Sequence, residues 1–153
     1  MARSSEGLGE ARVQGLFYED LSLGQTADIT RVVTLGDITA FAAVSGDVNP
    51  VHLDEAYART TAFGGRIAHG ILSAAFISAV LGVKLPGPGS IYLSQNLRFR
   101  RPVKIGDTVT ARVTVTELND HRGHATLSTV CLVDGKTALD GEAVLMVPRR
   151  KAP

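Results

Sequence analysis

Residues 70–82 read Gly-Ile-Leu-Ser-Ala-Ala-Phe-Ile-Ser-Ala-Val-Leu-Gly, and this stretch decides the fold. It contains no charged residue, so a helix formed here has almost no face suited to water and should be buried. Gly82 predicts the end of that helix. The stretch is shorter than the ~20 apolar residues that a membrane-spanning helix needs, and Ser73 and Ser78 interrupt it. We therefore expect one central helix that other elements cover.

Strand patterns lie on both sides of this helix. Residues 26–34 alternate weakly between apolar and polar and predict a first strand. Residues 108–116 alternate Val or Ala with Thr or Arg, which is typical of a strand with one buried face. Asp134-Gly135 is a two-residue hairpin signal between the last two strands. One early strand, a helical segment and four later strands predict a single α+β domain.

Length and charge agree with one domain that has no general affinity for polyanions. The chain has 153 residues, with 16 Lys and Arg against 15 Asp and Glu, so its net charge is +1. This balance predicts no nucleic-acid partner and no membrane partner. The polar amino terminus lacks the apolar core of a secretory signal, so we expect a cytoplasmic location.

Residues 45–52, Ser-Gly-Asp-Val-Asn-Pro-Val-His, carry the best candidates for proton transfer. Pro50 has no amide donor and disfavours helical geometry at Asn49, so the chain should turn here. A turn can aim the Asp47 carboxylate and the His52 ring at one water, as general acid–base catalysis requires. The alternative interpretation is an Asx turn whose side chains only cap a following helix.

Capping signals place this turn between two short helices. Thr34 and Asp37 resemble a capping pair, which predicts an amphipathic helix that delivers Asp47 at its end. Asp54 is expected to cap a second short helix that runs through Arg59.

Residues 41–56 closely resemble the hydratase 2 motif of the (R)-specific enoyl-CoA hydratases, which are MaoC-like dehydratases. The resemblance covers about residues 17–148 and implies the hot-dog fold, a curved antiparallel sheet wrapped around one long buried helix. It divides the chain into a flexible N-terminal extension (1–16), a hydratase domain (17–148) and a basic C-terminal tail (149–153). Four further segments match in the same order: 68–71 (AHGI), 86–93 (PGPGSIYL), 99–103 (FRRPV) and 105–107 (IGD).

The resemblance implies a hydro-lyase that adds water reversibly, with syn geometry, to trans-2-enoyl-CoA and forms (R)-3-hydroxyacyl-CoA. It implies no cofactor, because the coenzyme A thioester is itself the substrate. It also implies a homodimer that pairs sheet edges, with the acyl tunnel near the subunit boundary.

The resemblance assigns roles to individual residues. Asp47 would activate the water and His52 would relay a proton to Cα, although which of them takes the first proton stays open. The Gly70 amide, at the positive end of the helix dipole, would bind the thioester oxygen. Ser78 would lie beside the acid–base pair. The remaining expected substrate contacts are Asn49 and, along the acyl tunnel, Ile77 and Leu81.

Two other functions fit parts of the pattern. A hot-dog thioesterase would use the same acyl-CoA but attack the carbonyl carbon and release the thiol. A non-catalytic acyl-CoA-binding module would tolerate the loss of Asp47. Chain-length preference, the carrier (coenzyme A or acyl carrier protein) and the pathway (polyester precursor supply or fatty-acid breakdown) stay open.

Other polar residues and the single cysteine give weaker indications of function. His69 could bond to backbone or contact substrate, and His121 and His124 are expected to be exposed. Asp47, His52 and Asp54 lack a further His or Cys spaced to complete a metal site, so we expect no metal. Cys131 fits a small buried apolar residue. A basic run could meet the phosphates of coenzyme A or form a solvated strand face: Arg98, Arg100, Arg101 and Lys104.

Overall fold

The computed structural model describes residues 14–151. Most of the predicted extension and the last two residues of the predicted tail therefore lie outside the described residues. In chain order the elements are η1 (Tyr18–Asp20), β1 (Thr26–Val32), α1 (Leu35–Ser45), α2 (Pro50–Leu53), α3 (Glu55–Arg59), α4 (Gly70–Val83), β2 (Ile91–Phe99), β3 (Thr108–Asn119), β4 (His124–Val133) and β5 (Lys136–Met146).

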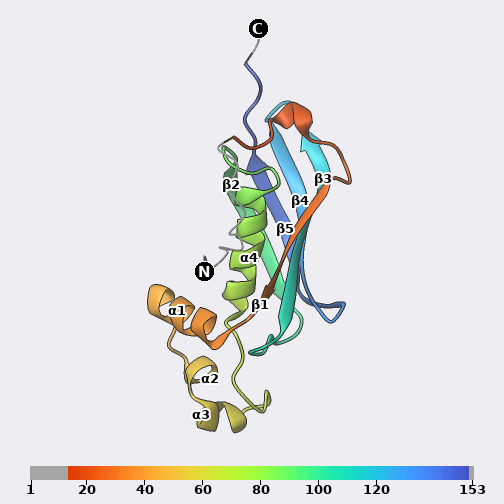
Figure 1. The fold of residues 1–153 in the computed structure, drawn as a ribbon. Coiled ribbons are helices and arrows are strands. Elements are labelled where there is room, and N and C mark those ends of the chain that lie inside the picture. Colours follow the sequence, from red (N-terminus) through yellow and green to blue (C-terminus); the bar gives the residue numbers. More distant parts are fainter. Residues whose placement is uncertain (1–13, 152–153) are drawn as a thin grey trace, which may run out of the picture.

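Five strands form one antiparallel sheet in the order β1-β3-β4-β5-β2. The helix α4 lies along one face of this curved sheet, while α1, α2 and α3 extend beyond the N-terminal end of α4 (Figure 1). This arrangement confirms the predicted α+β class and the hot-dog fold, in which a curved sheet wraps around one long helix.

The core lies between α4 and the inner face of the sheet. Ile77 and Val80 of α4 are fully buried, and Val109 and Val113 face them from β3, the strand whose alternation the sequence showed. Cys131 of β4 also points into this core. Burial raises the pKa of its thiol to about 12, and its Sγ donates to the Ser73 carbonyl oxygen at 3.4 Å. Cys131 thus acts as a packing residue, as expected.

The helix α4 differs from its prediction in two respects. It continues through Gly82, which does not take a left-handed φ, and ends at Val83 just before Pro86 prevents further helix. It is also not covered on all sides, because Ile71 is 52% exposed. The sheet covers only one side of α4, so an apolar strip of the helix stays open within a single chain.

Local turn and cap signals were largely accurate. Asp134 and Gly135 both have positive φ, as a type I′ hairpin requires. The Thr34–Asp37 capping box and the Asp54 cap are both formed. The first strand is shorter than predicted and ends at Val32, because the capping box begins α1 immediately afterwards. The short helix α2 is the following helix that the Asx-turn alternative expected, with Asn49 as its cap.

The start of the predicted tail is held against η1. The Arg150 amide donates to Glu19 Oε2 at 3.1 Å, and the Arg150 guanidinium bonds to Asp20. Hydrogen bonds from the backbone and from Arg150 hold the pKa values of the Glu19 and Asp20 carboxyls below their usual range. Within the described residues, no helix is both long and apolar enough to span a bilayer.

Candidate active site

The turn after α1 fixes the backbone of the acid–base candidates. Gly46 ends α1 in the left-handed region, with φ of 78°. The Asp47 carboxylate then accepts a hydrogen bond from the Asn49 amide at 3.2 Å through Oδ1. Asn49 in turn caps α2, because its side-chain oxygen accepts from the Val51 amide at 3.1 Å. The Asx turn is therefore formed, and it leaves the second carboxylate oxygen of Asp47 without a hydrogen-bond partner among the described residues.

His52 is buried, and its tautomer follows from one hydrogen bond. Its Nδ1 lies 2.8 Å from the Ile67 carbonyl oxygen. A carbonyl oxygen can only accept, so Nδ1 carries a hydrogen, and in the neutral ring Nε2 presents a lone pair. The His52 ring is thus oriented as a proton acceptor at Nε2.

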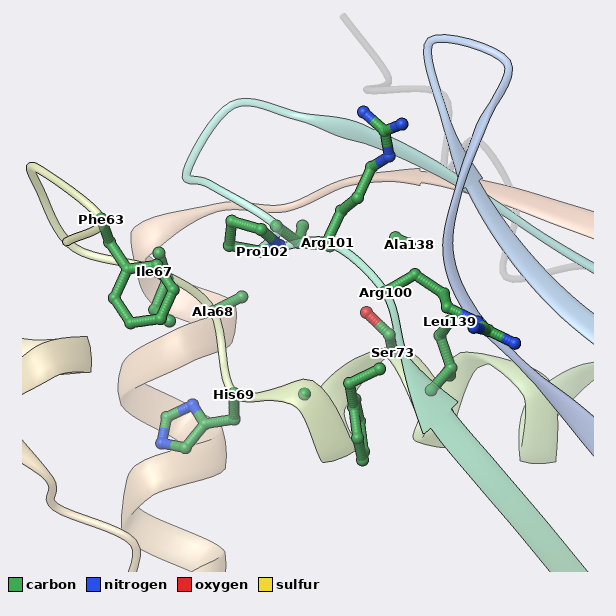
Figure 2. A pocket seen from close by; sticks show the side chains of 13 residues that line it. Phe63, Ile67, Ala68, His69, Ser73, Arg100, Arg101, Pro102, Ala138 and Leu139 are labelled. Carbon is green, nitrogen blue, oxygen red and sulfur yellow. The ribbon is translucent and has the colours of Figure 1, made fainter.

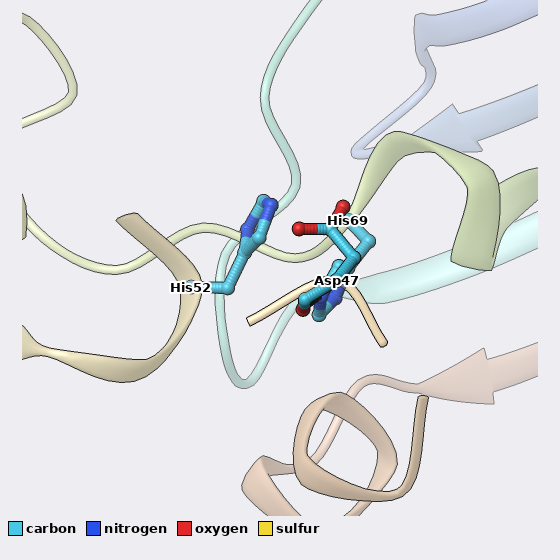
Figure 3. Close-up of side chains that lie close together, drawn as sticks. All are labelled: Asp47, His52 and His69. Carbon is cyan, nitrogen blue, oxygen red and sulfur yellow. Dashed lines mark hydrogen bonds between the residues drawn. The ribbon is translucent and has the colours of Figure 1, made fainter. Parts of the chain in front are cut away.

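Asp47, His52 and His69 meet at one point, although the chain separates them by up to 22 residues (Figure 3). One carboxylate oxygen and one nitrogen from each ring all lie within 4.8 Å of one another. Asp47 is exposed, whereas both imidazoles are buried. A carboxylate open to solvent beside a shielded imidazole can hold a water between two proton acceptors. The convergence of Asp47 and His52 that turn geometry predicted is therefore present.

The same three side chains are the group that could hold a metal ion in the described part of the chain. His69, rather than the Asp54 considered from the sequence, completes this group. Asp54 caps α3 instead, accepting from the Tyr57 amide at 3.1 Å. Sequence analysis considered His69 for a bond to backbone, which it makes, but the spacing of 17 residues from His52 corresponds to no local structure, so no sequence pattern placed His69 in this cluster. The absence of a metal stays a prediction.

Gly70 begins α4 directly after this cluster. The first amides of a helix have no partner within the helix, and His69, at the N-cap, makes no side-chain cap. The Gly70 amide is thus available to an oxyanion at the positive end of the dipole. A side chain here would also collide with a neighbour, because an ideal Cβ on Gly70 would lie 2.5 Å from Cε1 of Phe99. Glycine at this position satisfies a packing constraint as well.

A cavity of about 370 Å³ opens beside Gly70 (Figure 2). Phe63 and Ile67 lie at one end, and Ala138 and Leu139 at the other. Of the predicted basic run, the lining includes Arg100 and Arg101, and Arg100 also pairs with Asp140 at 3.3 Å. Arg98 lines a separate hollow with Asp140 and Glu142.

Three of the other predicted substrate contacts, Ser78, Ile77 and Leu81, lie on α4, whereas Asn49 lies in the turn beside Asp47. Ser78 is eight residues along α4 from Gly70, or about 12 Å along the helix axis. It lines a separate groove between α4 and β2, so within one chain it does not lie beside Asp47 and His52. Ile77 and Leu81 are buried in the core. The oxygen of Asn49 is engaged in its cap. Substrate contacts for these four residues stay predictions.

Comparison with known proteins gives consistent matches over most of the chain. Residues 21–135 match the model of the MaoC like domain family. The (R)-specific enoyl-CoA hydratase of Rhodospirillum rubrum is 54% identical, covering 88% of this chain and 93% of the relative. The enzyme of the same name from Aeromonas caviae is 47% identical, covering 85% of this chain and 98% of the relative.

Solved structures of similar proteins match the same part of the chain. The unliganded R-hydratase PhaJ1 of Pseudomonas aeruginosa superimposes with a TM-score of 0.84 at 48% identity, over 90% of this chain and 89% of that one. The chain therefore shares the hot-dog fold of solved R-hydratases. This chain belongs to the MaoC-like domain family.

Proposed function

We propose that this protein is an (R)-specific enoyl-CoA hydratase, a hydro-lyase that adds water reversibly to trans-2-enoyl-CoA. The observation that carries the proposal is the meeting of the Asp47 carboxylate and the His52 ring beside the uncapped N-terminus of α4. Curated relatives named (R)-specific enoyl-CoA hydratase and 3-hydroxybutyryl-CoA dehydratase, at 54% and 48% identity, support it.

The site geometry accounts for the water-activating half of the reaction. A water between the free oxygen of Asp47 and the Nε2 lone pair of His52 can lose a proton to this pair while its oxygen bonds to Cβ. If the same pair then delivers a proton to Cα, that proton arrives on the face that received the hydroxyl. Addition with syn geometry follows. Coupled groups titrate as a pair, and the first proton acceptor is therefore not assigned to either residue.

The helix terminus accounts for the other half. Addition at Cβ moves negative charge to the thioester oxygen, and the Gly70 amide can donate to that oxygen as the charge develops. The thioester bond stays intact, and no step requires a cofactor. A thioesterase would need a nucleophile directed at the carbonyl carbon, and the relatives named above support hydration over that alternative.

Purified protein should remove the conjugated-enoyl absorbance of crotonyl-CoA and produce (R)-3-hydroxybutyryl-CoA, because the water lies on one face of Cβ. Ultraviolet absorbance, chiral chromatography of the product and a thiol reagent measure the three relevant outcomes. Formation of the (S)-alcohol would contradict the stereochemical assignment. Release of coenzyme A without a hydroxyacyl thioester would support the thioesterase.

We infer that two copies pair through β2 and the open face of α4. The strand β2 lies at an edge of the sheet. Its exposed Ile91, Tyr92 and Leu93 continue the open strip of α4 that includes Ile71. Unpaired edges and large apolar patches are usually covered. A second copy covers both at once and extends the sheet across the subunit boundary. It also brings the apolar groove that contains Ser78 to that boundary.

Leu93→Glu should convert this dimer to a monomer, because the two-fold axis would place two carboxylates in one apolar interface at several kcal/mol each. Sedimentation velocity measures the change. The matched control is Val44→Glu, at the 84% exposed end of α1, which should stay dimeric. A Leu93→Glu variant that sediments as a dimer would place the interface elsewhere.

Coenzyme A is the proposed carrier, with Arg100 and Arg101 as candidate partners of its phosphates, since both line the cavity beside Gly70. We also propose a cytoplasmic location, which the polar amino terminus favours.

A further inference from the structure

His69 occupies a helix-capping position without acting as a cap. It is the N-cap residue of α4, yet its side chain makes no capping hydrogen bond. Residues chosen for capping have short oxygen-bearing side chains that accept from the first helical amides. The imidazole is instead 2% exposed and turned toward the turn that carries Asp47. A local helix-ending role therefore does not explain this residue.

The ring of His69 contacts both members of the acid–base pair. Its Nε2 lies 2.9 Å from the backbone carbonyl oxygen of Asp47. Its face stacks on His52, with ring centroids 3.8 Å apart and planes inclined by 28°. Phe41 of α1 packs against the same ring at 4.8 Å. His69 also precedes Gly70 directly in the chain. One side chain thus links the Asp47 turn, the His52 ring and the candidate oxyanion amide.

The hydrogen-bond pattern of His69 shows what holds the ring in place. The Asp47 carbonyl oxygen can only accept, so Nε2 carries the hydrogen. Nδ1 is buried and has no partner within the described residues. A buried polar atom without a partner is costly and needs an explanation. The contacts to Asp47 and His52 provide one, because they fix the ring in an orientation that leaves Nδ1 unpaired.

We propose that His69 is a positioning residue for hydration. It donates Nε2–H to the Asp47 carbonyl and stacks on His52, and so holds both groups in register with the Gly70 amide. The inference rests on the proposed hydratase function. Reacting groups must be placed within fractions of an ångström for an efficient step, and a misplacement of 1 Å can cost ~10²-fold in rate. Substitutions at His69 can separate the contribution of the hydrogen bond to Asp47 from that of the stacking on His52.

Two substitutions separate the hydrogen bond from the ring. His69→Phe keeps an aromatic face for stacking but removes the donor. His69→Gln loses the ring, yet its amide can reach the position of Nε2 and donate to the Asp47 carbonyl. His69→Asn, one methylene shorter, cannot reach it. Leu72→Ala is the matched control, because Leu72 is buried in the first turn of α4 and its truncation weakens packing but removes neither the His69 ring nor the hydrogen bond of that ring to Asp47.

Two readouts are needed. Steady-state kinetics with crotonyl-CoA give kcat and KM per folded protein, with the thermal midpoint measured alongside. Hydrogen exchange at the Asn49 amide, which bonds to Asp47 Oδ1, reports how firmly the turn is held without requiring activity. We expect His69→Phe to lower kcat by ~10- to 10²-fold with little change in KM, and to speed exchange at Asn49. His69→Gln should recover a substantial part of the parental kcat and of the parental exchange protection at Asn49. Leu72→Ala should change only the thermal midpoint of unfolding.

The outcomes are distinct. A His69→Phe protein with a lowered midpoint but parental kcat and parental exchange at Asn49 would overturn the proposal. Equal loss in the Gln, Asn and Phe variants would also overturn it, because the donor would then be irrelevant. If His69→Phe does not fold, the comparison of His69→Gln with His69→Asn takes its place. Equal kcat and equal exchange at Asn49 in these two variants would overturn the proposal. If the parent protein hydrates no enoyl thioester, the proposed function fails, and exchange at Asn49 alone decides whether His69 holds the turn.

Discussion

Asp47→Asn should lower kcat by at least the ~10²-fold typical of a lost general acid or base, while the fold is retained. The structure explains why this substitution should remove basicity without disturbing the turn. The Asn oxygen can still accept from the Asn49 amide, so the Asx turn survives and only basicity at the free oxygen is lost. His52→Ala should cost a similar factor, because it removes the lone pair at Nε2. Stopped-flow or steady-state hydration of crotonyl-CoA measures both.

Asp54→Asn is the matched control for this pair. It makes the same chemical change in another exposed Asp. The Oδ1 of Asp54 also accepts a hydrogen bond from a backbone amide, in this case the amide of Tyr57 in α3. We expect a small change in the thermal midpoint and a parental kcat. If the double variant of Asp47 and His52 is no slower than either single variant, the two residues act as one unit. Near-parental kcat in either dimeric single variant would remove that residue from the mechanism.

Gly70→Ala should reduce both stability and turnover, and Phe99 allows the two effects to be separated. The added Cβ would lie 2.5 Å from the Phe99 ring, so the ring or the helix start must shift. Alanine keeps the amide, so if the added Cβ prevents the developing oxyanion from reaching that donor, kcat should fall toward the ~10²-fold cost of losing one such contact. Phe99→Ala in the same chain removes the collision and should restore the midpoint but not the turnover.

The comparison requires Phe99→Ala alone as its baseline, because Phe99 also lines the cavity beside Gly70. Turnover that returns together with the midpoint in the double variant would mean that Gly70 is needed only for packing. The oxyanion donor would then have to be a different amide. A double variant that stays slow with an unchanged KM would support a contact that is strongest in the transition state.

Local features of the fold were predictable because they depend on neighbours in the chain. Alternation in residues 108–116 marked β3, and Asp134-Gly135 marked the hairpin between β4 and β5, because a period of two and a positive-φ turn each have few structural solutions. The turn after α1 was predictable for the same reason. Its Gly, Asn and Pro restrict the backbone, and that restriction places Asp47 and His52 on one short turn.

Features that depend on packing were not predictable in this way. Sequence indicated that α4 would be buried on every side, whereas the sheet covers only one side and leaves Ile71 exposed. The family resemblance implied that Ser78 lies beside the acid–base pair, whereas within one chain eight residues of helix separate Ser78 from Gly70. Hydropathy could not have shown the open side of α4, because hydropathy does not show which side of a helix another element or another subunit covers.

By itself the sequence determined the central helix, the strands around it and the turn that presents the Asp47 carboxylate near the His52 imidazole. These follow from short-range periodicity and backbone restriction. Only the tertiary structure decided that His69 completes this cluster and that Phe99 lies against Gly70, contacts between residues 17 or more apart in the chain. Such contacts arise when separate elements pack against one another, and no local pattern of residues encodes which side chains will then meet.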